Sequence, residues 1–381
     1  MKEDLTAEAL ALHAKHRGKL ATKVTTPIAS KQDLALTYTP GVADVSRAIA
    51  DDPEKVYDYT IKGHTVAVVT DGSAVLGLGN IGPEASLPVM EGKAAIFMTF
   101  ADIDAFPIAL DTQDTDEIIR SVRAIAPVFG GINLEDIAAP RCFEIEDALQ
   151  DLGIPVMHDD QHGTAIVVLA GLINAFKLKG KDLKEAKLVL LGAGAAGSGI
   201  ARLVADQVGD LILVDSKGII EAGRDDLAPY KRELAEITNH DHRTGSLRDA
   251  LAGADAFIGI SKGNLLTTDD IMLMNTQPVI FAMANPDPEI LPDVAKQAGA
   301  FIVATGRSDF PNQVNNSLVF PGIFKGALEA RVPRITHKMK LAVAKTLAEL
   351  VTEPTADKII PEPFDPGVAD AVAEAIKRLA D

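Results

Sequence analysis

Apolar positions in the second half of the chain recur in a regular alternation of short runs and longer segments. The run 164–176 is long enough for a buried helix, and the segment 194–206 predicts another helix. Between and after them, short apolar runs rich in aliphatic residues predict strands at Lys187–Leu191, Leu211–Val214, Ala256–Ile260, Val279–Met283 and Phe301–Ala304. Strands that alternate with helices in this way indicate a doubly wound parallel sheet.

The first half of the chain is less regular. Its pattern predicts helices at Thr6–Arg17 and Thr115–Ala126, and strands at Thr65–Thr70, Ala94–Thr99 and Ile154–Met157. From Gly322 onward the pattern is helical. A chain of 381 residues fits two domains. We therefore expect an α/β fold, with an N-terminal α/β substrate domain over 1–160 and a Rossmann-type domain with C-terminal helices over 161–381.

Composition and charge narrow the function classes. Apolar residues make up 47% of the chain, and 54 acidic against 37 basic residues give a formal charge of -17. Such a chain repels the phosphate backbone of nucleic acids and anionic membranes, so both are poor partners, whereas a local basic pocket for an anionic metabolite is compatible with it. The longest clean apolar stretch, Thr164–Phe176, is too short to span a bilayer, and the acidic start does not resemble a signal peptide. Cys142 is the single cysteine, expected to be buried and inert, and the compartment is expected to be the cytoplasm.

A glycine motif follows the strand Lys187–Leu191 directly. In Gly192-Ala-Gly194-Ala195-Ala196-Gly197 the first glycine permits a tight turn, the second permits approach of a pyrophosphate, and the third permits helix–strand packing. The helix that begins here offers free N–H groups to phosphates. This setting predicts a dinucleotide site.

The end of the next strand bears on which dinucleotide is bound. Asp215 stands where a carboxylate binds a ribose diol, which favours NAD because it would repel the 2′-phosphate of NADP. Lys217, two residues on, could pair with that phosphate. The preference for NAD is slight, and both cofactors stay open.

A second glycine motif, Gly77-Leu-Gly-Asn-Ile-Gly82, lies in the first half of the chain. The segment Asp71-Gly-Ser-Ala-Val-Leu76 separates it from its strand, and Pro83 and Pro88 are expected to interrupt the segment after it. It therefore lacks the strand–turn–helix setting of a dinucleotide site, although a turn near cofactor or substrate is compatible with it.

Polar residues gather in two segments of the first half, Asn133-Leu-Glu135-Asp136 and His158-Asp-Asp-Gln-His-Gly-Thr164. Helix capping and ordinary polar loops are adequate local explanations. Carboxylates from two loops, with no cysteine, would also suit a hard cation such as Mg²⁺ or Mn²⁺. A zinc site using His158 and His162 is less favoured because no third soft ligand is evident, and we interpret both histidines as structural.

Seven segments, in order along nearly the whole chain, resemble the malic enzyme family in its short bacterial form. They are Tyr38-Thr-Pro-Gly-Val42, Asp71-Gly-Ser through Gly82, Glu91-Gly-Lys93, Asn133-Leu-Glu-Asp136, His158-Asp-Asp-Gln-His-Gly-Thr-Ala165, Asn285-Pro and Asn315-Asn-Ser-Leu-Val-Phe-Pro-Gly322.

The resemblance implies residue roles. Glu135, Asp136 and Asp160 would hold the divalent metal. Lys93 would be the general base with Asp159 beside it, and Tyr38 the general acid. Substrate and nicotinamide would be oriented by three asparagines, which are Asn285, Asn315 and Asn316. Larger relatives carry an arginine soon after the Asp-Gly pair, where it binds substrate or cofactor, whereas this chain has Ala74. The resemblance therefore does not supply a residue that binds the substrate carboxylate at this position.

The reaction implied is the oxidative decarboxylation of malate to pyruvate and carbon dioxide, with reduction of NAD or NADP and a requirement for Mg²⁺ or Mn²⁺. Three alternatives stay open: a malolactic enzyme, a non-catalytic dinucleotide sensor, and an amino-acid dehydrogenase, which needs no divalent ion. The resemblance also implies a homodimer, in which Tyr38 of one subunit could serve the site of the other.

Overall fold

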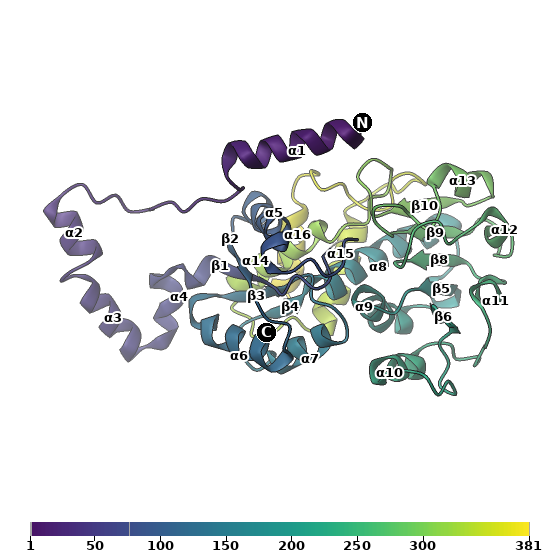
Figure 1. Ribbon diagram of the computed structural model, residues 1–381, viewed down its shortest axis with the longest axis horizontal. Coiled ribbons are helices and arrows are strands. Elements are labelled where there is room, and N and C mark those ends of the chain that lie inside the picture. The colour runs from purple at the N-terminus through teal and green to yellow at the C-terminus, as the bar shows by residue number, and fades with distance from the viewer. Residues whose placement is uncertain (1, 76, 381) are drawn as a thin grey trace.

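The computed structural model describes residues 2–75 and 77–380, which form two sheets covered by helices (Figure 1). The first sheet is parallel, in the order β2-β1-β3-β4, and the second is parallel except for its antiparallel edge strand β7, in the order β10-β9-β8-β5-β6-β7. The strands are β1 Thr65–Thr70, β2 Asp104–Ala109, β3 Gly131–Leu134, β4 Val156–His158, β5 Lys187–Leu191, β6 Asp210–Asp215, β7 Gly218–Ile219, β8 Ala256–Gly259, β9 Val279–Ala282 and β10 Ile302–Thr305.

Helices surround both sheets. The α-helices of the described residues are α1 Lys2–His16, α2 Lys31–Thr37, α3 Val42–Asp51, α4 Val56–Tyr59, α5 Pro83–Ala101, α6 Thr115–Ile125, α7 Arg141–Ala148, α8 Asp159–Lys179, α9 Ala195–Val204, α10 Pro229–Ile237, α11 Leu247–Leu251, α12 Thr268–Ile271, α13 Pro292–Gln297, α14 Phe320–Glu329, α15 His337–Glu349 and α16 Val368–Lys377. None of these helices is long and apolar enough to cross a membrane.

Each sheet has a point where the strand order reverses. In the first sheet β1 lies between β2 and β3, and in the second β5 lies between β6 and β8. Chain segments that leave such neighbouring strands diverge to opposite faces of the sheet, so a crevice opens beyond the carboxyl ends of the strands. The two crevices are therefore bordered by the loops that follow β1, β3, β5 and β8.

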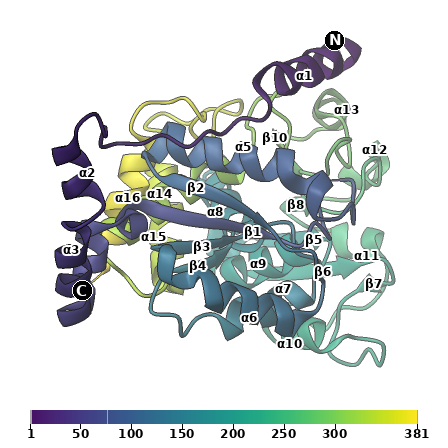
Figure 2. The same cartoon turned by 60° about the vertical axis from the view of Figure 1, so that its left-hand side comes forward.

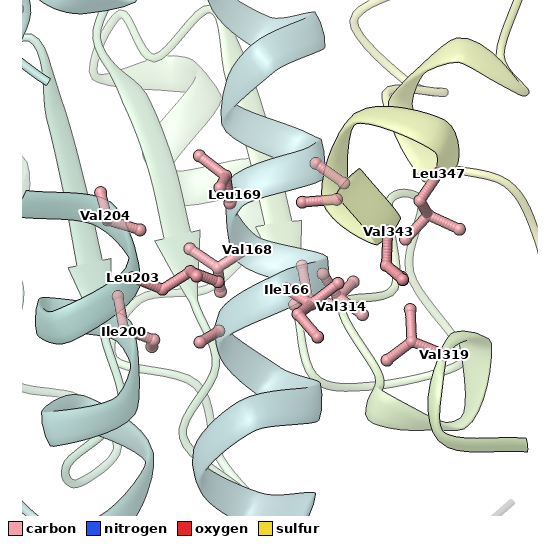
Figure 3. Packing of buried hydrophobic residues seen from close by; sticks show 14 of the residues in the cluster. Ile166, Val168, Leu169, Ile200, Leu203, Val204, Val314, Val319, Val343 and Leu347 are labelled. Carbon is pink, nitrogen blue, oxygen red and sulfur yellow. The ribbon is translucent and has the colours of Figure 1, made fainter. Parts of the chain in front are cut away.

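Helix α8 joins the two halves of the molecule. Figure 3 shows Ile166, Val168 and Leu169 of α8 between side chains of α9 on one side and of α15 on the other. The same buried cluster includes Val66 of β1 and Leu188 of β5, so a single apolar core connects the two sheets. Each fully buried aliphatic side chain contributes about 1.5–3 kcal/mol, and this packing fixes the start of α8 relative to the strands around it.

The expected α/β architecture is confirmed, and the second half of the chain agrees closely with the pattern. The strand Lys187–Leu191 has the expected bounds, and the other predicted strands of this half differ by a residue or so at their ends. Helices α14, α15 and α16 follow Gly322 or include it, as expected. These segments are buried and flanked by glycine or polar residues, which makes their patterns distinctive.

Three expectations for the first half are wrong. Ala94–Thr99 is not a strand but part of α5, because periodicity alone does not separate a short apolar strand from a buried helix. Pro83 and Pro88 do not interrupt the segment: Pro83 takes the first helical position, where its missing N–H costs no bond. The second glycine motif does therefore connect a strand to a helix, with Gly82 as the N-cap of α5.

Two strands of the first half had no predicted counterpart. Strand β2 contains Pro107, which argues against a strand in sequence but is tolerated because β2 lies at the edge of its sheet. Strand β3 spans only Gly131–Leu134, too few residues to display an alternating pattern.

The N-terminal segment extends from the body as an arm. Figures 1 and 2 both show α2 and α3 beyond the rest of the molecule, and no residue between 5 and 60 is buried. Its exposed apolar side chains include Leu10, Val24, Ile28, Leu36 and Tyr38. A stretch of this length that buries none of its apolar residues gains no stability from the core of its own chain.

Candidate active site

Three carboxylates converge at the crevice of the first sheet. Glu135 and Asp136 follow β3 directly, and Asp160 lies in the first turn of α8, immediately after β4. One carboxylate oxygen of each lies within 4.8 Å of the others. The backbone N–H of Asp136 donates to Oδ2 of Asp160 at 2.9 Å, which links the two loops. Parallel pairing of β3 with β4 brings the two loops to the same edge of the sheet.

Lys93 reaches this group from α5. Its Nζ lies 2.6 Å from Oδ2 of Asp159 and 2.8 Å from Oε1 of Glu135, and all three side chains are buried. The ammonium also lies 4.1 Å from the centre of the Phe320 ring. Burial lowers the pKa of Lys93, but the carboxylates of Asp159 and Glu135 outweigh burial and raise it above its usual value. Lys93 is therefore protonated in this arrangement.

The local charge favours a cation. Burial, together with the like charges of Asp160, Asp159 and Asp136, raises the pKa of Glu135 well above its usual value despite the attraction of Lys93. Four carboxylates face a single ammonium, so the cluster carries an excess of negative charge that a hard dication would offset. The all-oxygen donor set fits Mg²⁺ or Mn²⁺ and does not fit zinc. His162 is bound elsewhere, 2.9 Å from Oε1 of Glu146, consistent with a structural role.

The loop after β1 borders this crevice. Backbone N–H groups of Ile81 and Gly82 both donate to the carbonyl of Gly72 at 3.1 Å, which folds the loop back on itself. A Cβ at Gly72 would lie 2.2 Å from the carbonyl oxygen of Gly82, so only glycine fits. A Cβ at Gly77 would lie 2.4 Å from the carbonyl oxygen of Asn285. The second glycine motif therefore brings the first half of the chain against the Asn285 loop.

The asparagines differ in how they approach the cluster. Asn316 lies beside it, because a Cβ at Gly163 would meet both Oδ1 of Asp159 at 2.0 Å and Cβ of Asn316 at 2.9 Å. Oδ1 of Asn315 instead accepts from the N–H of Ser317 at 2.8 Å, which is a local turn bond. Asn285 is exposed beyond the end of β9.

Tyr38 does not join these residues. It follows α2 on the extended arm, and 66% of it is exposed. Figure 1 shows α2 apart from α5, which carries Lys93.

The glycine motif after β5 has the geometry of a dinucleotide site. Gly192 has φ 118°, and Ala195 and Ala196 are the first two residues of α9. A Cβ at Gly197 would lie 2.0 Å from the carbonyl oxygen of Gly192, which explains the third glycine. A Cβ at Gly194 would meet no atom within 4 Å, so the space above the N-terminus of α9 is open to a ligand.

The carboxylate of Asp215 is already occupied by cations. Oδ1 accepts from Arg224 Nη1 and from the N–H of Lys217, both at 3.0 Å. Oδ2 accepts from Lys231 Nζ at 2.7 Å and from Arg224 Nη2 at 3.3 Å. Burial raises the pKa of Asp215, but the bonds from Arg224 and Lys231 outweigh it and hold the pKa below its usual value. A ribose diol would share this carboxylate with Arg224 and Lys231, and a 2′-phosphate would meet their positive charge.

Other polar contacts near the first crevice were not predicted from the sequence. Asp71, at the end of β1, pairs with Arg141 at 2.9 Å, and Ser73 accepts from the N–H of Ala138 at 2.9 Å. The backbone N–H of Ala74 donates to the carbonyl of Asp136 at 2.9 Å. These contacts join loops some 65 residues apart in sequence, which no local pattern signals. Cys142 is buried as expected, and burial, aided by Glu146, raises the pKa of its thiol to about 12.

Comparison with known proteins matches both halves of the chain to one family. Residues 17–150 match "Malic enzyme, N-terminal domain" and residues 161–378 match "Malic enzyme, NAD binding domain". A bifunctional malic/malolactic enzyme of Bacillus subtilis is 55% identical over 99% of this chain and 93% of its own length. An NAD-dependent malic enzyme of Geobacillus stearothermophilus is 54% identical over 95% of this chain and 77% of its own length. The NADP-dependent malic enzyme of Halomonas elongata is 48% identical over 98% of this chain and 92% of its own length.

Solved structures agree with this match. The crystal structure of the NAD-dependent malic enzyme of Thermotoga maritima superposes with a TM-score of 0.94 at 53% identity, covering 97% of this chain and 98% of the other. That of the malic enzyme of Pyrococcus horikoshii gives a TM-score of 0.92 at 48% identity, covering 95% and 87%. With sequence, fold and the buried carboxylate cluster all in agreement, the chain belongs to the malic enzyme family.

Proposed function

We propose that this protein oxidises and decarboxylates malate to pyruvate and carbon dioxide, with reduction of NAD or NADP and with Mg²⁺ or Mn²⁺ at the carboxylate cluster. The observation that carries the proposal is the meeting of Glu135, Asp136 and Asp160 beside the buried Lys93. A dinucleotide-sensing module would have no use for a buried ammonium among carboxylates. Likewise, an amino-acid dehydrogenase would not need three oxygen donors placed to share one cation.

Each residue of the cluster takes a role that its contacts support. Glu135, Asp136 and Asp160 hold the dication. When bound, the cation would polarise the C2 hydroxyl of malate and oppose the carboxylates that keep Lys93 protonated. Lys93 accepts the C2 hydroxyl proton on Nζ, and Asp159, 2.6 Å away, orients that nitrogen. The side chains of Lys93 and Asp159 are buried, which limits the access of water to the proton transfer.

The second half of the chain supplies the nicotinamide, which accepts the hydride from C2. Gly192, Gly194 and Gly197 with Ala195 and Ala196 receive the pyrophosphate, and Asp215 lies at the ribose. Asn285 and Asn316 orient malate and the nicotinamide ring, and Asn315 holds the local turn that contains Asn316 by accepting from the N–H of Ser317. We also propose that the chain divides into 1–160 and 161–381, which the separate strand sets of the two sheets support.

A steady-state assay tests the proposal. We expect malate-dependent formation of reduced cofactor only when Mg²⁺ or Mn²⁺ is present, loss of the activity with a chelator, and recovery when metal is restored. Comparing NAD with NADP in the same assay measures the cofactor preference. Full activity after exhaustive chelation would contradict the metal role of the cluster.

A second activity is favoured by one relative, the bifunctional malic/malolactic enzyme, which matches nearly end to end. A malolactic reaction would form lactate without releasing reduced cofactor. Following lactate and cofactor absorbance in one reaction separates the two outcomes. Reduced cofactor in a one-to-one ratio with consumed malate identifies the oxidative reaction.

We further propose that the protein is a cytoplasmic homodimer in which the arm of each subunit packs on its partner and brings Tyr38 into the partner's site. The exposed apolar residues of the arm support this, because a second copy would cover them. The phenol of Tyr38 would then donate the proton that C3 requires after carbon dioxide leaves. The single buried cysteine is in keeping with a reducing compartment.

Mixing two inactive variants tests the shared site. Tyr38→Phe and Lys93→Ala should each be nearly inactive, but a hybrid dimer has one site with both Tyr38 and Lys93 intact. After unfolding and refolding together in equal amounts, we expect about one quarter of the unaltered activity, since half the dimers are hybrids with one good site each. Native mass spectrometry confirms hybrid formation. Hybrids without recovered activity would mean that Tyr38 serves its own subunit.

A further inference from the structure

Helix α7 places a carboxylate beneath the segment that supplies Asp159 and Asp160. Glu146 is 7% exposed. Its Oε1 accepts from the backbone N–H of His158 at 3.1 Å and lies 2.9 Å from Nε2 of His162. Its Oε2 accepts from Nε2 of Gln161 at 3.0 Å and lies 3.0 Å from the same His162 nitrogen. One carboxylate therefore binds three residues of a five-residue segment.

Lys340 of α15 defines the protonation of this network. Its Nζ lies 2.9 Å from Nδ1 of His162. An ammonium only donates, so Nδ1 must accept, and the ring proton belongs on Nε2, which donates to Glu146. The bonds to Glu146 are thus all donations to an ionised carboxylate. Burial raises the pKa of Glu146, but the hydrogen bond from His162 and the charge of Lys340 hold the pKa below its usual value.

The start of α8 depends on this carboxylate for its capping. His158 is the N-cap of α8, yet its side chain makes no capping hydrogen bond. Glu146, on another helix, accepts instead from the backbone N–H of His158 itself, and its negative charge also lies near the positive end of the α8 dipole. Asp159 and Asp160 are located between His158 and Gln161, two of the three residues that Glu146 binds. Any shift of that segment would move the Lys93 partner and one metal carboxylate together.

We propose that Glu146 is a positioning residue for the metal site, which holds the first turn of α8 so that Asp160 meets Glu135 and Asp136 and Asp159 meets Lys93. The inference rests on the proposed metal role of that cluster. Glu146 contacts residues 158–162 and acts through them. Glu146 binds them from α7, only ten residues after Asp136 in sequence. The short stretch from Asp136 to Glu146 therefore connects the loop that supplies Glu135 and Asp136 to the segment that supplies Asp160.

The test is direct binding of Mn²⁺ to the protein without malate or cofactor, measured by the electron paramagnetic resonance signal of free Mn²⁺. Glu146→Gln keeps the side-chain shape, but both oxygens of Glu146 accept hydrogen bonds, so the NH₂ group of the glutamine must face a donor of residues 158–162. We expect the Kd for Mn²⁺ to rise about ten- to hundredfold, the range for groups that orient metal ligands. At saturating Mn²⁺, kcat should return to within about threefold of the unaltered protein. A merely structural defect would lower thermal stability without this recovery by metal.

A matched control lies on the same helix. Glu144 is exposed on α7, so Glu144→Gln should leave the Kd unchanged. Should Glu146→Gln fail to fold, Gln161→Met removes one donor at similar volume, and a rise in Kd of about threefold or more supports the inference. An unchanged Kd in the folded variant overturns it. Absence of Mn²⁺ binding by the unaltered protein would instead overturn the proposed metal site itself, so the two failures are distinguishable.

Discussion

Replacing Lys93 by alanine is expected to lower kcat for malate oxidation by about 10²–10⁴-fold, the usual contribution of a general base. Nζ of Lys93 is the amine buried among the carboxylates, 2.6 Å from Asp159 and 2.8 Å from Glu135. The affinity for reduced cofactor, measured by nicotinamide fluorescence, should change little, because the glycine motif lies on β5 and α9. Retention of kcat within about tenfold would contradict the role of Lys93.

Two controls separate loss of the base from loss of the fold. Lys62 is also buried, but its Nζ donates to the carbonyl oxygens of Phe129 at 2.7 Å and Ala126 at 3.2 Å. Lys62→Met should cost stability yet leave kcat of the folded protein near its unaltered value. Methylamine added to Lys93→Ala should restore part of the activity, because a free amine can enter the vacated space and accept the proton. A merely unfolded variant would not respond to the amine.

Removal of one metal carboxylate should have the second large effect. Asp136 has φ 53°, a left-handed conformation that asparagine tolerates better than alanine, so Asp136→Asn removes the charge with the least backbone strain. We expect the Kd for Mn²⁺ to rise by more than about a hundredfold, beyond the range for groups outside the ligand set. The Mn²⁺ concentration for half-maximal activity should rise in parallel. Unchanged metal dependence would remove Asp136 from the site.

The same variant should be no less stable than the unaltered protein when metal is absent. Asp136 is one of the like charges that raise the pKa of Glu135, and its neutralisation relieves that repulsion. Thermal unfolding in chelator measures this. Asp270→Asn is the matched control, since Asp270 is also buried but caps α12 through Thr267, and its loss should lower stability without altering Mn²⁺ binding.

Local features of the chain were well predicted from its residues. The strand before Gly192, the glycine motif and the helix after it form one continuous segment, and each part is specified by neighbours within a few positions. Cys142 was expected to be buried, and it is. The error at Ala94–Thr99 has the same origin as these successes, because a local pattern of apolar residues is shared by a buried helix and a buried strand.

Contacts between distant segments depended on the tertiary structure instead. Lys93 and Asp159 are 66 residues apart, and their contact depends on α5, β4 and α8 meeting around one sheet. The family resemblance suggested that Asp159 would lie beside Lys93, but neither the bond from His158 to Glu146 nor the cations on Asp215 had any sequence signal. The exposed position of Tyr38 was equally unreadable from its own segment.

The residues alone were thus sufficient for the family, the dinucleotide turn and the residue types of a hard-cation site, because these depend on neighbours in sequence and on motif order. Strand order and the packing of α8 then brought Glu135, Asp136, Asp160 and Lys93 into one charged cluster. Burial and Coulomb energy act through space, so the charge state of each group depends on partners that the linear order of residues does not reveal.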